Sequence, residues 1–287
     1  MAVDTPIDQY RVFGNPIHQS KSPNIHTAFA TATGQHINYQ AQLVAEGAFE
    51  TTVTDFFESG GKGLNITVPF KQRAFAMAQV LSPAAQKAEA ANTLYVNPQG
   101  QLVADNTDGM GLVRDICHNL GGELKAQRIL VLGAGGAVRG VLQPILAQRP
   151  AQVIIANRTH SKALDLAASF TDLGPIEVVP MAQLQGPFDW IINGTSASLA
   201  GDLPPLPAGL LTNTSRCYDM MYSAQTTVFN AWALGQGAAA ADDGLGMLVE
   251  QAAQSFNLWR GALPPTAEVL LALRSELRKQ NLGNLSP

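Results

Sequence analysis

Residues 128–138 read RILVLGAGGAV, and this stretch decides the fold class. Arg128–Leu132 is mostly apolar, as in a strand that is buried inside a parallel sheet. A glycine loop follows (Gly133, Ala134, Gly135, Gly136 and Ala137), and a helical pattern runs on to about Gln148. In such a unit the first glycine permits a tight turn, and the second lets the backbone approach a pyrophosphate at the helix N-terminus. The stretch therefore predicts a doubly wound Rossmann domain of the α/β class that binds a dinucleotide.

One position departs from the usual G-x-G-x-x-G pattern. Val138 stands where glycine or alanine normally allows close helix–strand packing, so we expect slightly wider packing there. A glycine triplet also occurs in ordinary turns, but its place between a strand and a helix favours a cofactor loop.

The strand that follows indicates which dinucleotide is bound. NAD enzymes usually end this strand with an acidic residue that accepts hydrogen bonds from the ribose 2′-hydroxyl. Here Val153–Ala156 is followed by Asn157, Arg158 and Thr159, with Lys162 one helical turn later. Arg158 offers a planar pair of donors to a 2′-phosphate, and Lys162 adds a second positive charge. The sequence therefore favours NADP over NAD.

Strand and helix patterns alternate along the rest of the chain, as expected for an α/β protein. Ser22 and Pro23 suit the N-cap and first position of a helix that runs to Thr33. The other strands are expected at Tyr10–Phe13, Tyr39–Val44, Leu64–Val68, Ile176–Val179, Trp190–Asn193, Cys217–Met221 and Ala238–Ala241, with a hairpin of Leu94–Val96 and Leu102–Ala104. The other helices are expected at Phe49–Ser59, Gly109–Leu120, Ser161–Phe170 and Leu245–Gln280, the last one broken at Gly261 and Pro264-Pro265.

Length and composition narrow the function classes. The chain has 287 residues, enough for two domains, and a net charge of −4 without any basic block. Because nucleic-acid binding needs a phosphate-neutralising patch, we expect no nucleic-acid partner. The 5 histidines form no H-E-x-x-H motif, so we expect no metal site. Cys117 and Cys217 are too few for a disulfide framework, and we expect both thiols to be reduced and buried.

The N-terminal segment and the length of the apolar runs indicate where the protein is located. Met1–Tyr10 carries Asp4 and Asp8 and has no apolar core, so we expect no signal peptide. Apolar runs all stay below the length of about 18 residues that a membrane span needs. We therefore expect a cytoplasmic protein without a membrane partner.

Five short motifs outside the glycine loop indicate the substrate. They are SKSP (Ser20–Pro23), NITVPFK (Asn65–Lys71), ANT (Ala91–Thr93), NTDG (Asn106–Gly109) and DGLGMLVEQ (Asp243–Gln251). Together with the glycine loop and Asn157-Arg158-Thr159, their order and spacing resemble the shikimate dehydrogenase family over Tyr10–Leu273. The resemblance implies an oxidoreductase that reversibly reduces 3-dehydroshikimate to shikimate with NADPH, in the chorismate and aromatic amino-acid pathway.

The resemblance also implies roles for single residues. Ser20 and Ser22 match residues that bind the substrate carboxylate. The ring hydroxyls and keto group would be held by Asn65, Thr67, Lys71, Asn92, Asp108 and Gln251, with Tyr222 as a further contact. Met220 and Gly244 match contacts to the nicotinamide end of the cofactor.

Gly194-Thr195-Ser196-Ala197-Ser198 lacks the final glycine of a nucleophile elbow, and we expect this segment to line the nicotinamide pocket instead.

Lys71 and Asp108 are the expected catalytic pair. Reducing a ketone requires a proton at the oxygen where alkoxide charge develops, and a lysine beside a carboxylate can supply and position it. Free lysine is a poor base at neutral pH, so Lys71 either is tuned by its surroundings or stays charged and stabilises the oxyanion. Taken singly, Lys71 would be read as a solvated lysine, and Ser22 and Asp108 as helix caps.

The chain is expected to form two α/β domains. Residues 1–108 would form a substrate-binding domain that residues 244–287 complete, and residues 109–243 would form the NADP domain. Two alternatives stay open: a quinate/shikimate dehydrogenase that prefers NAD, and a non-catalytic sensor that binds NADP and shikimate-like ligands. Either a monomer or a homodimer is compatible with the sequence.

Overall fold

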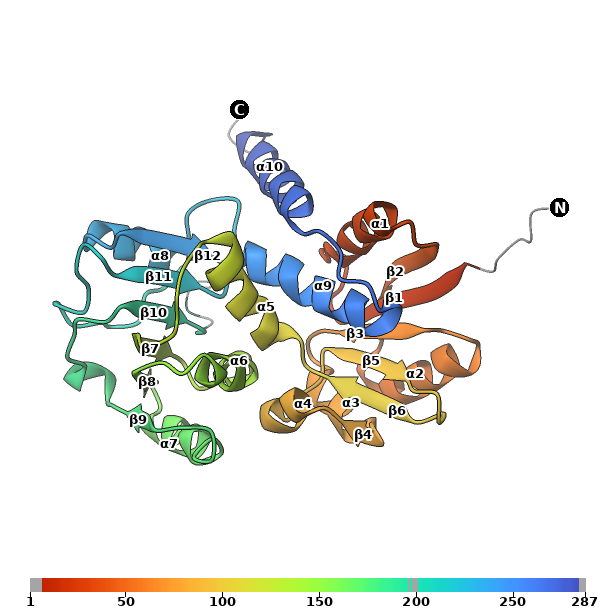
Figure 1. The fold of residues 1–287 in the computed structure, drawn as a ribbon, viewed down its shortest axis with the longest axis horizontal. Coiled ribbons are helices and arrows are strands. Elements are labelled where there is room, and N and C mark those ends of the chain that lie inside the picture. The colour runs from red at the N-terminus through yellow and green to blue at the C-terminus, as the bar shows by residue number, and fades with distance from the viewer. Residues whose placement is uncertain (1–6, 196, 198–200, 284–287) are drawn as a thin grey trace. The chain divides into compact units, whose positions relative to one another are not determined.

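A computed structural model describes residues 7–195, 197 and 201–283. Most of Met1–Tyr10, and Ser196 and Ser198 of the segment after Asn193, therefore lie outside the described residues. The chain divides into two compact units, coloured along the sequence in Figure 1. Unit 1 holds the chain up to Thr107 together with Val249–Val269, and unit 2 holds Asp108–Leu248 together with the chain from Leu270 onward.

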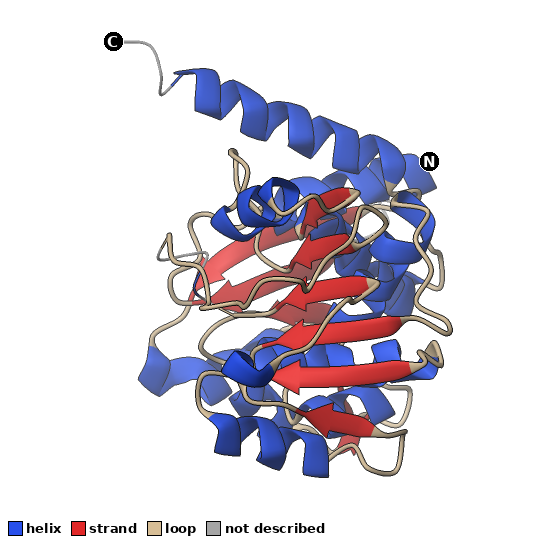
Figure 2. Ribbon diagram, turned by 90° about the vertical axis from the view of Figure 1, so that its left-hand side faces the viewer, coloured by secondary structure: helices blue, strands red, loops and turns tan. Residues whose placement is uncertain are grey.

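Unit 2 is a doubly wound α/β domain, as the glycine-loop stretch predicts. Its sheet has the order β12-β11-β10-β7-β8-β9, and every neighbouring pair of strands is parallel. The arrows of these strands run side by side in one direction in Figure 2. Chain order reverses between β7 and β10, which is the switch point where such sheets bind ligands at the carboxyl ends of their strands. The strands are β7 (Arg128–Leu132), β8 (Gln152–Ala156), β9 (Ile176–Val178), β10 (Trp190–Asn193), β11 (Arg216–Asp219) and β12 (Ala240–Asp243).

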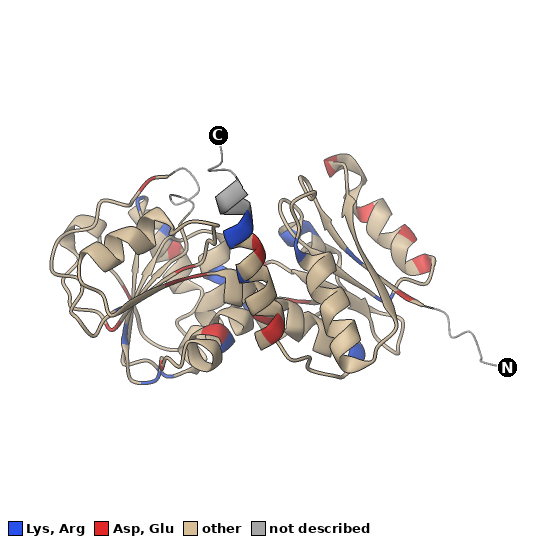
Figure 3. Ribbon diagram, turned by 90° about the horizontal axis from the view of Figure 1, so that it is seen from above, with Lys and Arg blue, Asp and Glu red and all other residues tan. Residues whose placement is uncertain are grey.

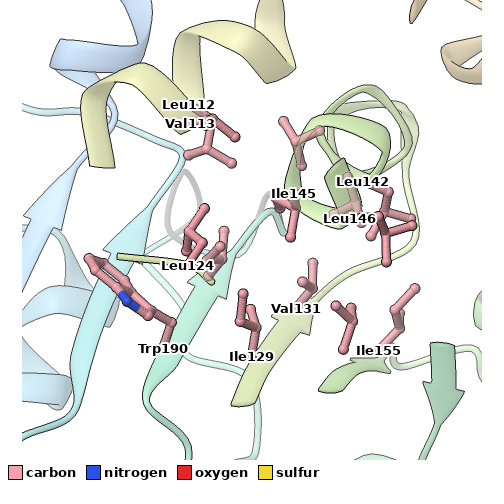
Figure 4. Close-up of a cluster of buried hydrophobic side chains, with 14 of the residues drawn as sticks. Leu112, Val113, Leu124, Ile129, Val131, Leu142, Ile145, Leu146, Ile155 and Trp190 are labelled. Atoms are coloured by element: carbon pink, nitrogen blue, oxygen red, sulfur yellow. The ribbon is translucent and has the colours of Figure 1, made fainter. Parts of the chain in front are cut away.

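Helices cover this sheet and bury its apolar side chains. Leu112 from α5 and Ile145 from α6 point toward Val131 on β7 (Figure 4), and all three are fully buried. The helices of unit 2 are α5 (Asp108–Arg114), α6 (Gly136–Ala147), α7 (His160–Ala168), α8 (Val228–Gly235) and α10 (Ala267–Gly283), with a π-helix at Asp115–Asn119 and a short 3₁₀ turn at Met181–Gln183. The buried apolar layer fixes the strand ends that carry the cofactor residues.

Unit 1 contains a mixed sheet with the order β2-β1-β3-β5-β6-β4. Strand β5 runs antiparallel to both β3 and β6, so its start lies at the sheet edge where β3 and β6 end. The strands are β1 (Asp8–Gly14), β2 (Ile37–Leu43), β3 (Gly63–Ile66), β4 (Val80–Leu81), β5 (Thr93–Val96) and β6 (Leu102–Asp105). The helices are α1 (Ser22–Thr33), α2 (Phe49–Glu58), α3 (Lys71–Met77) and α4 (Pro83–Ala88), with a 3₁₀ turn at Glu46–Ala48. Three of the substrate motifs therefore lie at this sheet edge, at the end of β3, the start of β5 and the end of β6.

Helix α9 (Leu245–Arg260) packs its second half on the sheet of unit 1. The Trp259 ring lies 4.9 Å from that of Tyr10, and Gly63 leaves room for it, since an added Cβ would lie 2.5 Å from the indole. Arg260 Nε donates to Gln35 at 2.8 Å, and its guanidinium pairs with Asp8. These contacts fix the C-terminal end of α9 on unit 1.

Several local predictions need correction. Lys21, not Ser22, is the N-cap of α1, so Ser22 and Pro23 are its first two helical residues. Helix α5 begins at Asp108 rather than Gly109, and its α-helical part ends at Arg114, where the π-helix takes over. Cys217 is buried as expected, and burial raises the pKa of its thiol to about 12, but Cys117 is only half-buried.

The division into units also differs from the predicted domain bounds near the C-terminus. Unit 2 takes the residues up to Leu248 and those from Leu270 onward, so only Val249–Val269 joins unit 1. One reason is a bidentate contact in which Arg274 of α10 donates to the carboxylate of Asp243, at 2.5 and 2.7 Å. The ion pair of Arg274 and Asp243 connects α10 to the end of β12.

A buried carboxylate supports the start of α9. Asp115 accepts hydrogen bonds from the Tyr218 hydroxyl at 2.6 Å and from Asn119 at 2.9 Å. Burial, followed by the nearby Asp115 charge, raises the pKa of Tyr218 well above its usual value, so the hydroxyl remains a donor. The carboxylate occupies the space that a side chain at Gly246 would need, because an added Cβ would lie 1.9 Å from Oδ1.

Replacing Gly246 by alanine is expected to lower the free energy of unfolding by about 1–3 kcal/mol, because it overpacks a buried carboxylate. Urea unfolding followed by circular dichroism measures the change. Gly235→Ala at the end of α8 is the control, since an added Cβ there meets no described atom within 4 Å. Equal unfolding midpoints for the wild type and Gly246→Ala would contradict the packing argument.

The distribution of charged and apolar residues bears on possible membrane and metal binding. Acidic and basic residues are interspersed over both units in Figure 3. Within the described part of the chain, no helix is both long and apolar enough to cross a bilayer. The same residues contain no cluster of three or more histidine, cysteine, aspartate or glutamate side chains that could hold a metal ion.

Candidate functional site

The glycine loop of unit 2 links β7 to α6 at the switch point of the sheet. Gly133 has φ +107°, a conformation that favours glycine, and its amide donates to Ala156 at 2.8 Å. Gly135 is the N-cap of α6, and Gly136 is its first residue. An added Cβ at either glycine would meet no described atom within 4 Å, so the helix N-terminus is open to an approaching group. The loop therefore fits a dinucleotide pyrophosphate.

Val138 is accommodated by Gly194, a glycine outside the cofactor loop. Val138 is fully buried, and a Cβ at Gly194 would lie 2.4 Å from its side chain. Gly194 follows β10, the strand on the other side of the switch point, and its amide donates to Leu132 at 2.9 Å. The room that Val138 requires therefore comes from the missing side chain of Gly194.

The loop after β8 presents the residues expected to select the cofactor. Asn157 donates to the Thr159 carbonyl at 2.8 Å, which orders the turn into α7. Thr159 is the N-cap of α7 without a side-chain capping bond, and Arg158 and Lys162 are both exposed. Two cationic side chains thus flank a helix N-terminus, an arrangement suited to a phosphate group.

The carboxyl ends of β11 and β12 bring together the expected nicotinamide contacts. Gly244 packs directly against the backbone of Met220, where an added Cβ would lie 2.3 Å from the carbonyl oxygen. Its amide donates to Met221 at 2.9 Å, and half-buried Tyr222 follows in the same loop. Met220 and Gly244 are therefore adjacent, as neighbouring parallel strands require.

Two buried residues outside the predicted set of site residues, Asn193 and Asp219, organise this edge. Asn193 donates to Asp219 at 3.1 Å, and both side chains are fully buried. Asn193 also accepts from the Thr195 hydroxyl at 2.7 Å, while Asp219 accepts from the Met221 amide at 3.2 Å. The pair thereby positions Thr195 after β10 and Met221 after β11.

In unit 1, three of the expected substrate residues form one hydrogen-bonded cluster. Asn65 on β3 donates to the backbone carbonyl of Asn92 at 3.1 Å. Asn92, directly before β5, donates to Gln251 of α9 at 3.2 Å. Asn65 and Asn92 are buried, and Gln251 is half-buried. Asn92 and Gln251, which are 159 positions apart in the sequence, thus share one site with Asn65.

Thr67 and Lys71 lie in the chain that follows β3, and Asp108 comes three residues after the end of β6. Lys71 begins α3, and its carbonyl accepts from the Ala91 amide at 2.8 Å, which ties it to the loop that carries Asn92. The Thr67 amide donates to Phe13 at 2.9 Å and so continues β3 beside β1. Asp108 follows directly after Thr107 and begins α5 of unit 2. Lys71 and Asp108 are both half-buried.

Ser20 and Ser22 lie together at the start of α1. The Ser20 hydroxyl accepts from the Ser22 amide at 3.3 Å, and both residues are half-buried. The N-cap of α1, Lys21, makes no side-chain capping bond.

Asn65 is supported by a buried stack of two rings, Tyr39 and His26. The Tyr39 hydroxyl donates to Asn65 Oδ1 at 2.7 Å, and His26 stacks on Tyr39 with ring centroids 4.1 Å apart and an interplanar angle of 5°. Phe256 and Trp259 of α9 flank the imidazole. Burial lowers the pKa of His26 to about 3, because the charged ring would lose its hydration among aromatic side chains.

This shift predicts sensitivity to acid. The unfolded chain protonates His26 at an ordinary pKa of 6.5, whereas the folded protein does so only near pH 3, so acid between these values favours unfolding. His26 is expected to make the protein about 3 kcal/mol less stable at pH 4 than at pH 6.5. The His26→Phe variant should lose this contribution in urea titrations at both pH values, and His36→Phe, at an exposed histidine, is the control. The same pH dependence in wild type and His26→Phe would be inconsistent with this assignment.

Family models match most of the chain. The shikimate dehydrogenase substrate binding domain matches residues 12–94, the shikimate / quinate 5-dehydrogenase model matches residues 115–200, and the shikimate 5′-dehydrogenase C-terminal domain matches residues 244–274.

Individual relatives match over nearly the full length. A shikimate dehydrogenase (NADP(+)) of Cellvibrio japonicus is 56% identical over 274 residues, which are 95% of this chain and 99% of the relative. The crystal structure of an Ael1 enzyme from Pseudomonas putida superposes with a TM-score of 0.88 at 46% identity, covering 93% of this chain and 98% of that one. A shikimate 5-dehydrogenase from Thermus thermophilus, crystallised with NADP(H) and shikimate, gives a TM-score of 0.81 at 31% identity, covering 93% and 99%.

Proposed function

This chain belongs to the shikimate dehydrogenase family, and we propose that it catalyses the reversible, NADP-dependent reduction of 3-dehydroshikimate to shikimate. This activity would make it an oxidoreductase acting on a CH–OH group in chorismate and aromatic amino-acid biosynthesis. The observation that carries the proposal is the cluster of Asn65, Asn92 and Gln251. These amides gather donors and acceptors at one sheet edge, as recognition of a ring with several hydroxyl groups requires.

The cofactor site supports NADP. The open N-terminus of α6 would hold the pyrophosphate, and Met220 and Gly244 would lie at the nicotinamide end. Asn157, Arg158, Thr159 and Lys162 would surround the 2′-phosphate. Bound NADPH supplies the hydride for the ketone carbon, while the residues of the chain orient the reactants and handle the proton.

The substrate residues take complementary roles in this proposal. Ser20 and Ser22 would donate hydrogen bonds to the substrate carboxylate, and Thr67 and Tyr222 would add further polar contacts. Lys71 and Asp108 would flank the keto oxygen, so that a proton reaches it as alkoxide charge develops. In the reverse direction the same groups would accept the proton from the shikimate hydroxyl.

An absorbance assay at 340 nm tests the proposal and its two alternatives together. Shikimate and quinate are each offered with NADP and with NAD. Rapid NADPH formation from shikimate is the expected result, with slower reactions in the other three combinations. Preference for NAD, or for quinate, would favour the quinate/shikimate alternative. Shikimate binding without turnover in any combination would favour the non-catalytic sensor and overturn the proposal.

The cellular location and the oligomeric state of the enzyme are part of the same proposal. A cytoplasmic location fits a pathway that consumes cytoplasmic NADPH and a chain with two unpaired cysteines. A monomer and a homodimer both fit, because all the residues assigned to the two ligands belong to one chain. Sedimentation of the purified enzyme with and without shikimate distinguishes the two states.

A further inference from the structure

Two buried hydroxyl groups lie under the substrate amides of unit 1. Thr93 begins β5, and Ser255 lies one helical turn after Gln251 on α9. Their side-chain oxygens are 2.7 Å apart, and both residues are 0% exposed. We call Thr93 and Ser255 the hydroxyl pair.

The hydroxyl pair contacts the amide of Asn65. Asn65 Nδ2 lies 3.2 Å from the Thr93 oxygen and 3.0 Å from the Ser255 oxygen. The Tyr39 hydroxyl donates to Asn65 Oδ1 on the other side of the group. A hydroxyl group can donate or accept, but the Thr93 proton is directed to Asn92 Oδ1, and the Asn92 carbonyl, 3.1 Å from Asn65 Nδ2, can only accept. The hydroxyl pair, the Asn92 carbonyl and Tyr39 therefore together fix which way the Asn65 amide faces.

The pair also reaches Asn92 and Gln251. The Thr93 hydroxyl donates to Asn92 Oδ1 at 2.8 Å, which leaves Asn92 Nδ2 to donate to Gln251 Oε1 at 3.2 Å. The Ser255 oxygen lies 3.2 Å from the Gln251 carbonyl oxygen and 3.2 Å from the Thr107 hydroxyl, which itself contacts Asn92. Changing either member of the pair would remove a hydrogen bond from this buried network, in which Asn65 also donates to the Asn92 carbonyl and Asn92 Oδ1 also accepts from the Thr107 amide.

We propose that Thr93 and Ser255 are positioning residues that fix the amide orientations of Asn65, Asn92 and Gln251 and thereby set the affinity for the substrate ring. This inference rests on the proposed function. A polar group that loses a buried partner costs enough to change affinity by about 5- to 100-fold, whereas a residue needed only for folding would change stability alone.

The test uses the full-length variants Thr93→Val and Ser255→Ala. Each is expected to raise KM for shikimate by about 10-fold, with KM for NADP unchanged. The conservative variants Thr93→Ser and Ser255→Thr keep a hydroxyl group and are expected to restore most of the affinity. Calorimetric titration with shikimate measures the same change without turnover.

A matched control separates positioning from loss of stability. Thr227 is a buried N-cap of α8 in unit 2 whose hydroxyl accepts from Asn230 at 3.2 Å. Thr227→Ala is expected to lower the melting temperature without changing KM for shikimate. If Thr93→Val and Ser255→Ala behave like Thr227→Ala, the inference is wrong. If the wild-type protein does not oxidise shikimate, the proposed function fails instead, and the variants are not needed to show it.

Discussion

Replacing Lys71 by alanine is expected to lower kcat for shikimate oxidation by about 10²–10⁴-fold, while shikimate still binds. The expectation follows from its position at the start of α3, where its carbonyl is tied to the loop carrying Asn92. Loss of the side chain removes the group that handles the proton at the keto oxygen, but leaves the amide cluster that holds the ring. Steady-state kinetics measure the first effect, and calorimetric titration measures the second.

Lys62 provides the control for this variant. It precedes β3 at the end of the strand opposite to Lys71 and is exposed, so Lys62→Ala removes the same charge from the same unit. Its kcat is expected to equal that of the wild type. Full activity of Lys71→Ala would exclude the assigned role, and loss of binding in parallel with kcat would instead make Lys71 a binding residue.

The cofactor half of the protein is largely predictable from its sequence. An apolar strand, a glycine loop and a helix follow one another within residues 128–147, and local patterns of this kind report directly on local structure. The ends of β7 and β8 are therefore located correctly. Strand β12 is displaced from the expected Ala238–Ala241 to Ala240–Asp243, because its two aspartates have tertiary partners that the pattern does not reveal. Asp243 pairs with Arg274, and Asp242 lies near Arg216.

The substrate half is less visible, because its site is made by contacts between distant segments. The family motifs include Asn65, Asn92 and Gln251, but periodicity alone gives no reason to bring them together. The four-residue spacing of Gln251 and Ser255 was a usable signal, since it places both on one helix face. Thr93 stands inside the ANT motif, where only the pairing of β5 with β3 shows that it lies opposite Asn65.

Replacing Arg158 by alanine is expected to raise KM for NADP by about 10- to 100-fold and to leave KM for NAD unchanged. The exposed guanidinium lies in the turn between β8 and α7, beside a helix N-terminus that has no side-chain cap. Each hydrogen bond between charged groups contributes about 1.5–3 kcal/mol, and 1.4 kcal/mol corresponds to a tenfold change in affinity. NAD has no 2′-phosphate, so its binding should not respond.

Further variants show whether the effect belongs to the 2′-phosphate. Lys162→Ala, alone and combined with Arg158→Ala, should weaken NADP binding further, and added salt should weaken it less in the double variant than in the wild type. Arg278→Ala on α10 removes an exposed arginine elsewhere in unit 2 and controls for net charge. If Arg158→Ala raised KM for NAD and NADP equally, Arg158 would contact a part that both cofactors share. The selectivity for NADP would then have to come from Lys162, Thr159 or the amides at the start of α7.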